Sequence, residues 1–88
     1  MSSIALKLKG RADFMDMFTA GAFSKVVATK NEHGRWQLFG LCGVGNMAVF
    51  VEKARGGVRE WSGLDYLAEF CGKAGIERWE VHARKINN

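Results

Sequence analysis

The hydrophobic positions of this chain follow a period of two in some segments and a period of three to four in others. Residues 4–9 alternate isoleucine or leucine with alanine or lysine, which predicts a short first strand. Within residues 14–18, apolar side chains recur at i, i+3 and i+4, which predicts a brief helix that depends on tertiary contacts. Residues 25–30 and 35–41 have the composition and alternation of two strands, and the polar segment 31–34 predicts the turn between them.

A second pair of strands is predicted further along the chain. Residues 47–54 are apolar on both faces for most of their length, which indicates a strand in the centre of the sheet. Glycine-rich turns are predicted before it, at 43–46, and after it, at 55–57, because glycine adopts positive φ without a steric penalty. Residues 58–61 are then expected to complete an antiparallel meander.

The C-terminal third predicts a helix followed by a strand. Ser62 and Asp65 approximate a capping box at the start of the helix, and Gly75 stands where a left-handed C-cap is expected. Its apolar stripe consists of Leu64, Leu67, Ala68 and Cys71, and Tyr66 and Phe70 widen the stripe on one side. Residues 78–85 alternate again and predict a last strand. We therefore expect a single α+β domain over residues 1–88, with an antiparallel sheet of about five to six strands, one main helix packed across one face and a short N-terminal helix.

Composition narrows the class of protein. The chain is 48% hydrophobic and 25% charged, so it has the apolar content that a folded domain needs. A net charge of +4 favours an acidic partner. No apolar stretch reaches the ~18 residues that would span a bilayer, and the N-terminus lacks the apolar core of a secretory signal. We expect a soluble, cytoplasmic protein that does not associate with a membrane.

Groups that could carry catalysis or bind a metal are few. Cys42 and Cys71 lie in apolar surroundings, which is typical of reduced, buried thiols. With His33 and His82 they supply the atoms of a zinc site, but they lack the close pairing that such sites use. The glycine-rich segment 40–46 precedes a strand and not the helix that a phosphate-binding loop requires. We expect no metal, no cofactor and no enzymatic activity; an enzyme would need a polar pocket that the sequence does not reveal.

The candidate binding site is a group of cations and aromatic rings around the turn at 55–57, with one cation from a neighbouring strand: Lys53, Arg55, Arg59, Trp61 and Arg35. Arginine pairs with phosphates, and exposed aromatic rings stack on bases, so this group could bind nucleic acid or an acidic partner. Alternation places Arg59 and Trp61 on one face of the predicted strand, and we expect the edge of this face to be partly exposed to solvent. The alternative interpretation is that the tryptophans are core residues and the cations are solvated. If the group binds DNA, charge reversal at Arg55 and Arg59 is expected to leave the fold intact and abolish binding.

Residues 55–81 also follow a longer pattern: arginine–glycine–x–x–arginine–x–aromatic, a leucine–aspartate helix start, a glycine–isoleucine turn and an aromatic–glutamate–valine strand. The matching positions are Arg55, Gly56, Arg59, Trp61, Leu64, Asp65, Gly75, Ile76, Trp79, Glu80 and Val81. This pattern resembles ParC-like partition-associated small proteins of plasmids and mobile elements. The resemblance covers the last third to half of the chain. It implies an accessory role in maintaining or regulating a mobile element, without enzymatic activity.

Two functional hypotheses follow from these observations. The favoured one is a non-enzymatic accessory protein of a bacterial plasmid or mobile element, which binds DNA or a DNA-bound protein through the basic turn. The alternative is a small protein-interaction module that inhibits a host defence or regulatory complex, since a sheet with an open edge can pair with a partner's strand. A domain of this size with three tryptophans also leaves a homodimer open.

Overall fold

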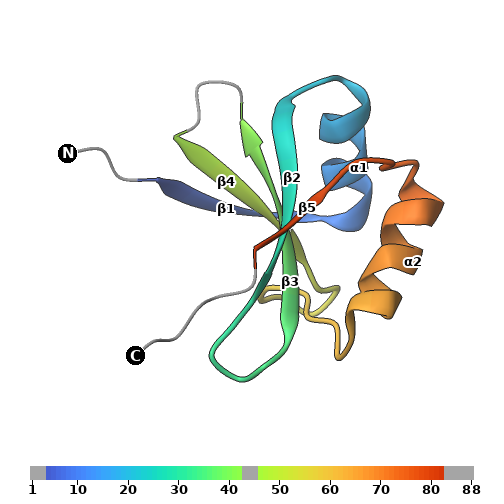
Figure 1. Ribbon diagram of the computed structural model, residues 1–88. Coiled ribbons are helices and arrows are strands. Elements are labelled where there is room, and N and C mark those ends of the chain that lie inside the picture. The colour runs from blue at the N-terminus through green and yellow to red at the C-terminus, as the bar shows by residue number, and fades with distance from the viewer. Residues whose placement is uncertain (1–3, 43–45, 83–88) are drawn as a thin grey trace.

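A five-stranded mixed sheet carries two helices on one of its faces (Figure 1). The computed structural model describes residues 4–42 and 46–82. The elements, in chain order, are β1 (Ala5–Gly10), α1 (Arg11–Thr19), β2 (Phe23–Lys30), β3 (Trp36–Cys42), β4 (Met47–Glu52), α2 (Leu64–Ala74) and β5 (Glu80–His82). The predicted α+β class is confirmed, and the predicted central position of the fourth strand is also correct.

The sheet is mixed because each helix connects two strands that run in the same direction. The strand order is β1-β4-β3-β2-β5, and β2, β3 and β4 form an antiparallel centre. At the two edges, β1 pairs with β4 and β5 pairs with β2, both in parallel. A helical crossover returns the chain to the end at which the preceding strand began, so the strand after it is parallel to the strand before it. The prediction of a fully antiparallel sheet is therefore wrong at both edges.

Residues 58–61 do not form the predicted strand. They make only two isolated antiparallel bridges, between Glu52 and Val58 and between Trp36 and Trp61. In the second bridge each tryptophan N–H donates to the carbonyl of the other, with both N···O distances at 2.8 Å. The first bridge holds the end of β4 and the second holds the start of β3, so the segment crosses the end of the sheet and does not run along one strand.

Two other predicted segments extend beyond the part of the chain that the structure describes. Most of the turn expected at 43–46 lies outside it, as do residues 83–85 of the last predicted strand. Within the described residues that strand is the short β5, which pairs with β2 over three residues.

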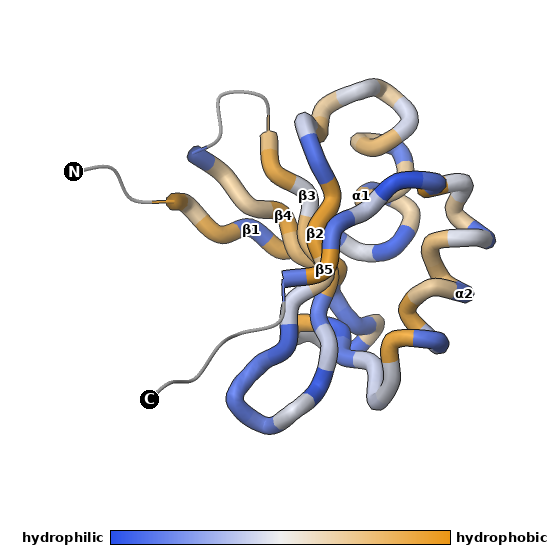
Figure 2. Tube along the Cα trace, in the orientation of Figure 1, coloured by the Kyte–Doolittle hydropathy of each residue, from blue (hydrophilic) through white to orange (hydrophobic). Residues whose placement is uncertain are grey.

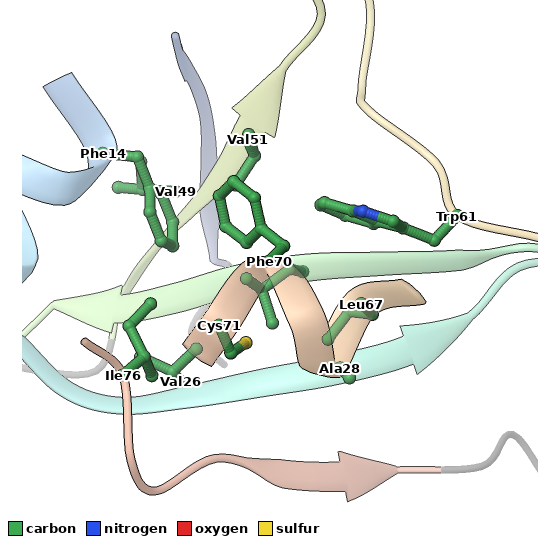
Figure 3. Close-up of a cluster of buried hydrophobic side chains, with 11 residues drawn as sticks. Phe14, Val26, Ala28, Val49, Val51, Trp61, Leu67, Phe70, Cys71 and Ile76 are labelled. Atoms are coloured by element: carbon green, nitrogen blue, oxygen red, sulfur yellow. The ribbon is translucent and has the colours of Figure 1, made fainter. Parts of the chain in front are cut away.

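The helices and the sheet share one apolar core on the face that α1 and α2 cover (Figure 3). α1 contributes Phe14 and α2 contributes Leu67, Phe70 and Cys71, and these side chains pack against alternate residues of the central strands. The strand residues of this core are Val26, Ala28, Leu38, Val49 and Val51. Ala68, which the predicted stripe included, is exposed. Among the described residues, no helix is long and apolar enough to cross a membrane.

The two ends of α2 differ in how well the sequence predicted them. The N-cap residue is Gly63 and no side chain caps the helix, so the capping box predicted from Ser62 is wrong. Ser62 lies one residue too early to reach the first free N–H groups. At the other end Gly75 adopts φ 78°, and the N–H of Ile76 donates to the carbonyl of Cys71 at 2.9 Å. This is the expected left-handed C-cap, with buried Ile76 as its apolar contact.

The opposite face of the sheet carries no helix among the described residues, and we call it the open face. Phe39 and Phe50 lie side by side on it, with ring centroids 5.0 Å apart. In β1, Leu8 is in register with Phe50, and Leu6 and Leu8 are 69% and 40% exposed. Figure 2 shows apolar residues along β1, β3 and β4. The open face therefore leaves apolar surface in contact with solvent.

Candidate functional site

A hollow lined by both helices and by residues 59–62 gathers four cations from four separate segments of the chain. We call it the basic hollow, and its volume is about 480 Å³. Its cations are Arg11 at the start of α1, Arg35 before β3, Arg59 in the segment 58–61 and Lys73 in the last turn of α2. Among the residues that the structure describes, two carboxylates, those of Glu60 and Glu69, line the same hollow. The surplus of positive charge favours an anion there.

Arg59 is held over two aromatic rings of the core. Its guanidinium carbon lies 5.1 Å from the ring centroid of Trp61 and 5.7 Å from that of Phe70. Trp61 is 6% exposed, so its indole belongs to the core, as the alternative interpretation proposed. The expected placement of a cation beside this indole is confirmed. Trp61 thus fixes the position of Arg59 and does not present a free ring to solvent.

Arg35 is positioned by an ion pair and by the turn that precedes it. Its Nε lies 3.1 Å from Oε1 of Glu60, and the other oxygen of Glu60 accepts a hydrogen bond of 2.8 Å from the amide of Asn31. The side-chain oxygen of Asn31 also accepts from the backbone N–H of Arg35 at 3.0 Å. Glu60 therefore neutralises part of the charge of Arg35, which remains about half exposed.

The hollow is completed by three residues that the sequence does not indicate as site residues: Arg11, Lys73 and Tyr66. Among the described residues no carboxylate lies within 4.0 Å of either cation, so neither is held in an ion pair there. Tyr66 is 58% exposed and supplies an accessible aromatic ring next to these charges. Arg11 and Lys73 are far apart in sequence, and no local pattern indicates that the fold brings them together.

Lys53 and Arg55 do not line the basic hollow. Both are exposed on the predicted turn, which two backbone hydrogen bonds of 2.9 Å close between Lys53 and the two glycines that follow Arg55. Gly56 and Gly57 have φ values of 94° and 85°, so the turn needs glycine at both positions. The predicted group of site residues is thus divided: Arg35, Arg59 and Trp61 meet at the hollow, and Lys53 and Arg55 lie on the turn beyond it.

The remaining reactive groups are dispersed. Burial raises the pKa of the Cys71 thiol to about 11, which keeps it protonated and unreactive at neutral pH. On the surface, the hydrogen bond from His82 lowers the pKa of Glu80, and the nearby Lys25 acts in the same direction. Within the described residues, no three His, Cys, Asp or Glu side chains are grouped so that they could hold a metal ion.

Comparison with family models, with curated proteins and with solved structures finds no match to this chain. The resemblance to ParC-like proteins therefore rests on its own matching positions. Several of these have structural roles here, because Gly75 and Ile76 form the C-cap of α2 and Trp61 lies in the core. Of the four charged matching positions, Arg55, Arg59, Asp65 and Glu80, only Arg59 lines the basic hollow.

Proposed function

We propose that this protein is a non-enzymatic accessory protein that binds DNA, or a DNA-bound partner, through the basic hollow. One observation carries the proposal: four cations from separate segments surround the same hollow as an exposed tyrosine. Cations that follow a phosphate backbone, together with rings that stack on bases, are the common features of proteins that bind single strands. The same cations would also contact the phosphates of a duplex.

The residues of the hollow have different roles in this proposal. Arg11 and Lys73 are free to contact phosphates, and Arg59 offers a guanidinium whose position its two rings fix. Tyr66 stacks on an unpaired base. Arg35 contributes less, because Glu60 already pairs with it.

Reversing the two unpaired charges tests this proposal. Binding is measured by fluorescence anisotropy with a labelled oligonucleotide, as a single strand and as a duplex. The double variant Arg11→Glu, Lys73→Glu should weaken both complexes by more than about tenfold, since it removes two phosphate contacts and places two like charges against the backbone. Tyr66→Ala should weaken the single-strand complex more than the duplex complex.

The matched control is the double variant Lys30→Glu, Arg78→Glu, which changes the net charge equally and lies outside the basic hollow. It should bind DNA at least several-fold more tightly than the Arg11, Lys73 variant. Equal losses in the two variants would show that only the net charge matters and would overturn the assignment to the hollow. Absence of binding to both single and double strands would overturn the proposed function.

The resemblance to ParC-like proteins supports a biological setting for this binding, the maintenance of a bacterial plasmid or mobile element. Genes for partition or conjugation next to the coding sequence would support that setting. Neighbouring genes that encode anti-defence functions would instead favour an inhibitor of a host complex.

A further inference from the structure

β1 has an unpaired outer edge at one side of the sheet. The strand order ends at β1, and no strand of the described residues pairs with its outer side. Ala5 donates its N–H to the carbonyl of Asn46 at 2.9 Å, on the side of β4. Because the backbone groups of successive residues in a strand point in opposite directions, those of Leu6 and Leu8 point away from β4. They are therefore available to a further strand.

The side chains of β1 give this edge two different faces. Leu6 and Leu8 lie on the open face, where Leu8 is in register with Phe50. Lys7 and Lys9 are exposed on the face that carries the helices. An added strand would thus meet leucines on one side and two ammonium groups on the other.

A second copy of this chain does not complement the edge. Antiparallel pairing of two β1 strands about a two-fold axis keeps each face of the sheet on its own side. The two registers that overlap most of β1 place Lys7 opposite the partner's Lys7, or Lys7 opposite the partner's Lys9. Like charges that are directly opposite destabilise a strand pair. The charge of β1 therefore favours a different, acidic strand.

We propose that the outer edge of β1 binds an extended segment of an acidic protein, in which aspartate or glutamate alternates with apolar residues. The acidic side chains lie beside Lys7 and Lys9, and the apolar side chains lie beside Leu6 and Leu8. The backbone of the segment pairs with the outward N–H and C=O groups of the two leucines, which is β-strand addition. This surface does not depend on the basic hollow, so either proposal can fail without the other.

The probe is an acetylated octapeptide of alternating glutamate and valine, titrated into isotopically labelled protein and followed by NMR. The amides of Leu6 and Leu8 should exchange quickly with solvent in the free protein and become protected when the peptide is present, because they gain acceptors. The peptide of alternating lysine and valine should bind about tenfold more weakly, since each opposite-charge pair becomes a like-charge pair. If millimolar acidic peptide leaves both amides unprotected, the lysines serve only to prevent strand pairing and the proposal is wrong.

Two variants test the same contacts from the protein side. Leu8→Pro removes an outward donor but no hydrogen bond to β4, so the fold should persist and protection by the peptide should be lost. Lys7→Glu, Lys9→Glu should reverse the preference between the two peptides. The control Lys30→Glu, Arg78→Glu has the same net charge and should keep the original preference, because Lys30 ends β2 and Arg78 lies two residues before β5, on the opposite side of the sheet from β1. If the control also reversed its preference, net charge alone would explain the effect, and the assignment of the binding site to β1 would be wrong.

Discussion

Arg59 shows why sequence proximity is a poor guide to which cation is free to bind. It follows Arg55 by four residues, and the two flank the same turn. The structure places Arg55 in solvent and Arg59 over the rings of Trp61 and Phe70. Alternation predicted the contact with Trp61, but it could not predict Phe70, which comes from α2. Arg59 therefore supports the core as well as the charge of the hollow.

Charge reversal should accordingly have different effects on stability at these two arginines. Arg59→Glu removes two cation–π contacts and should lower the free energy of unfolding by about 1 to 2 kcal/mol. Arg55→Glu, on the exposed turn, should change it by less than about 0.5 kcal/mol. Urea denaturation followed by tryptophan fluorescence measures both. Equal stability of the two variants would show that the contacts of Arg59 with Trp61 and Phe70 do not stabilise the core.

Cys71 should make the free energy of unfolding depend on pH in the alkaline range. Burial raises its thiol pKa from 9.0 to about 11, so between these values the folded state holds a proton that the unfolded state has lost. Stability is then fully present below pH 9 and falls as the pH rises toward 11, by an amount on the order of 2 kcal/mol. Urea denaturation at a series of pH values should show this fall. The fall should be smaller in Cys71→Ala, whose other groups titrate as before, and an identical fall in both proteins would contradict the assignment to Cys71.

At the scale of elements, periodicity predicted the helices and most strands but not how the strands pair. The apolar positions of α2 and the glycine that ends it are local signals. The structure confirms the burial of Leu67 and Cys71 and the C-cap at Gly75, but Ala68 is exposed and the predicted N-cap is wrong. The parallel edges depend on where each crossover delivers the next strand. Packing between distant segments determines which strand lies next to which. The sequence therefore indicated that β1 and β5 are strands, but not which strands they pair with.

Replacing either of two glycines near the C-terminal end of α2 by alanine should change the stability of the protein in opposite directions. Gly75 adopts φ 78°, where an added Cβ is strained, so Gly75→Ala should destabilise the protein by about 1 to 2 kcal/mol. Gly72 lies within the same helix, and a Cβ there would meet no atom within 4 Å. Gly72→Ala should therefore stabilise the protein by about 0.5 to 1 kcal/mol. Thermal unfolding of the two variants measures the difference, and two changes of the same sign would contradict this account of the cap.

At the scale of the whole molecule, the site arises from segments that are distant in the sequence. The sequence indicates Arg35 and Arg59 as site residues, because both stand near aromatic residues along the chain. It could not identify Arg11 and Lys73, which only the fold brings to the same hollow, or the exposed Tyr66 beside them. Among the described residues, the same fold leaves one face of the sheet without a helix and the outer edge of β1 without a partner strand. The proposed DNA binding and the proposed strand addition thus use two separate surfaces of one small domain.

The dependence of DNA affinity on salt concentration shows whether the cations of the basic hollow contact phosphates. If the four cations of the basic hollow contact phosphates, a plot of log K against log salt concentration for a single strand should have a slope of about −3. The Arg11→Glu, Lys73→Glu variant should reduce the magnitude of that slope by at least about 1.4, the share of two phosphate contacts. An affinity that does not change with salt, or a slope that the variant leaves unaltered, would contradict the claim that the hollow binds the phosphate backbone.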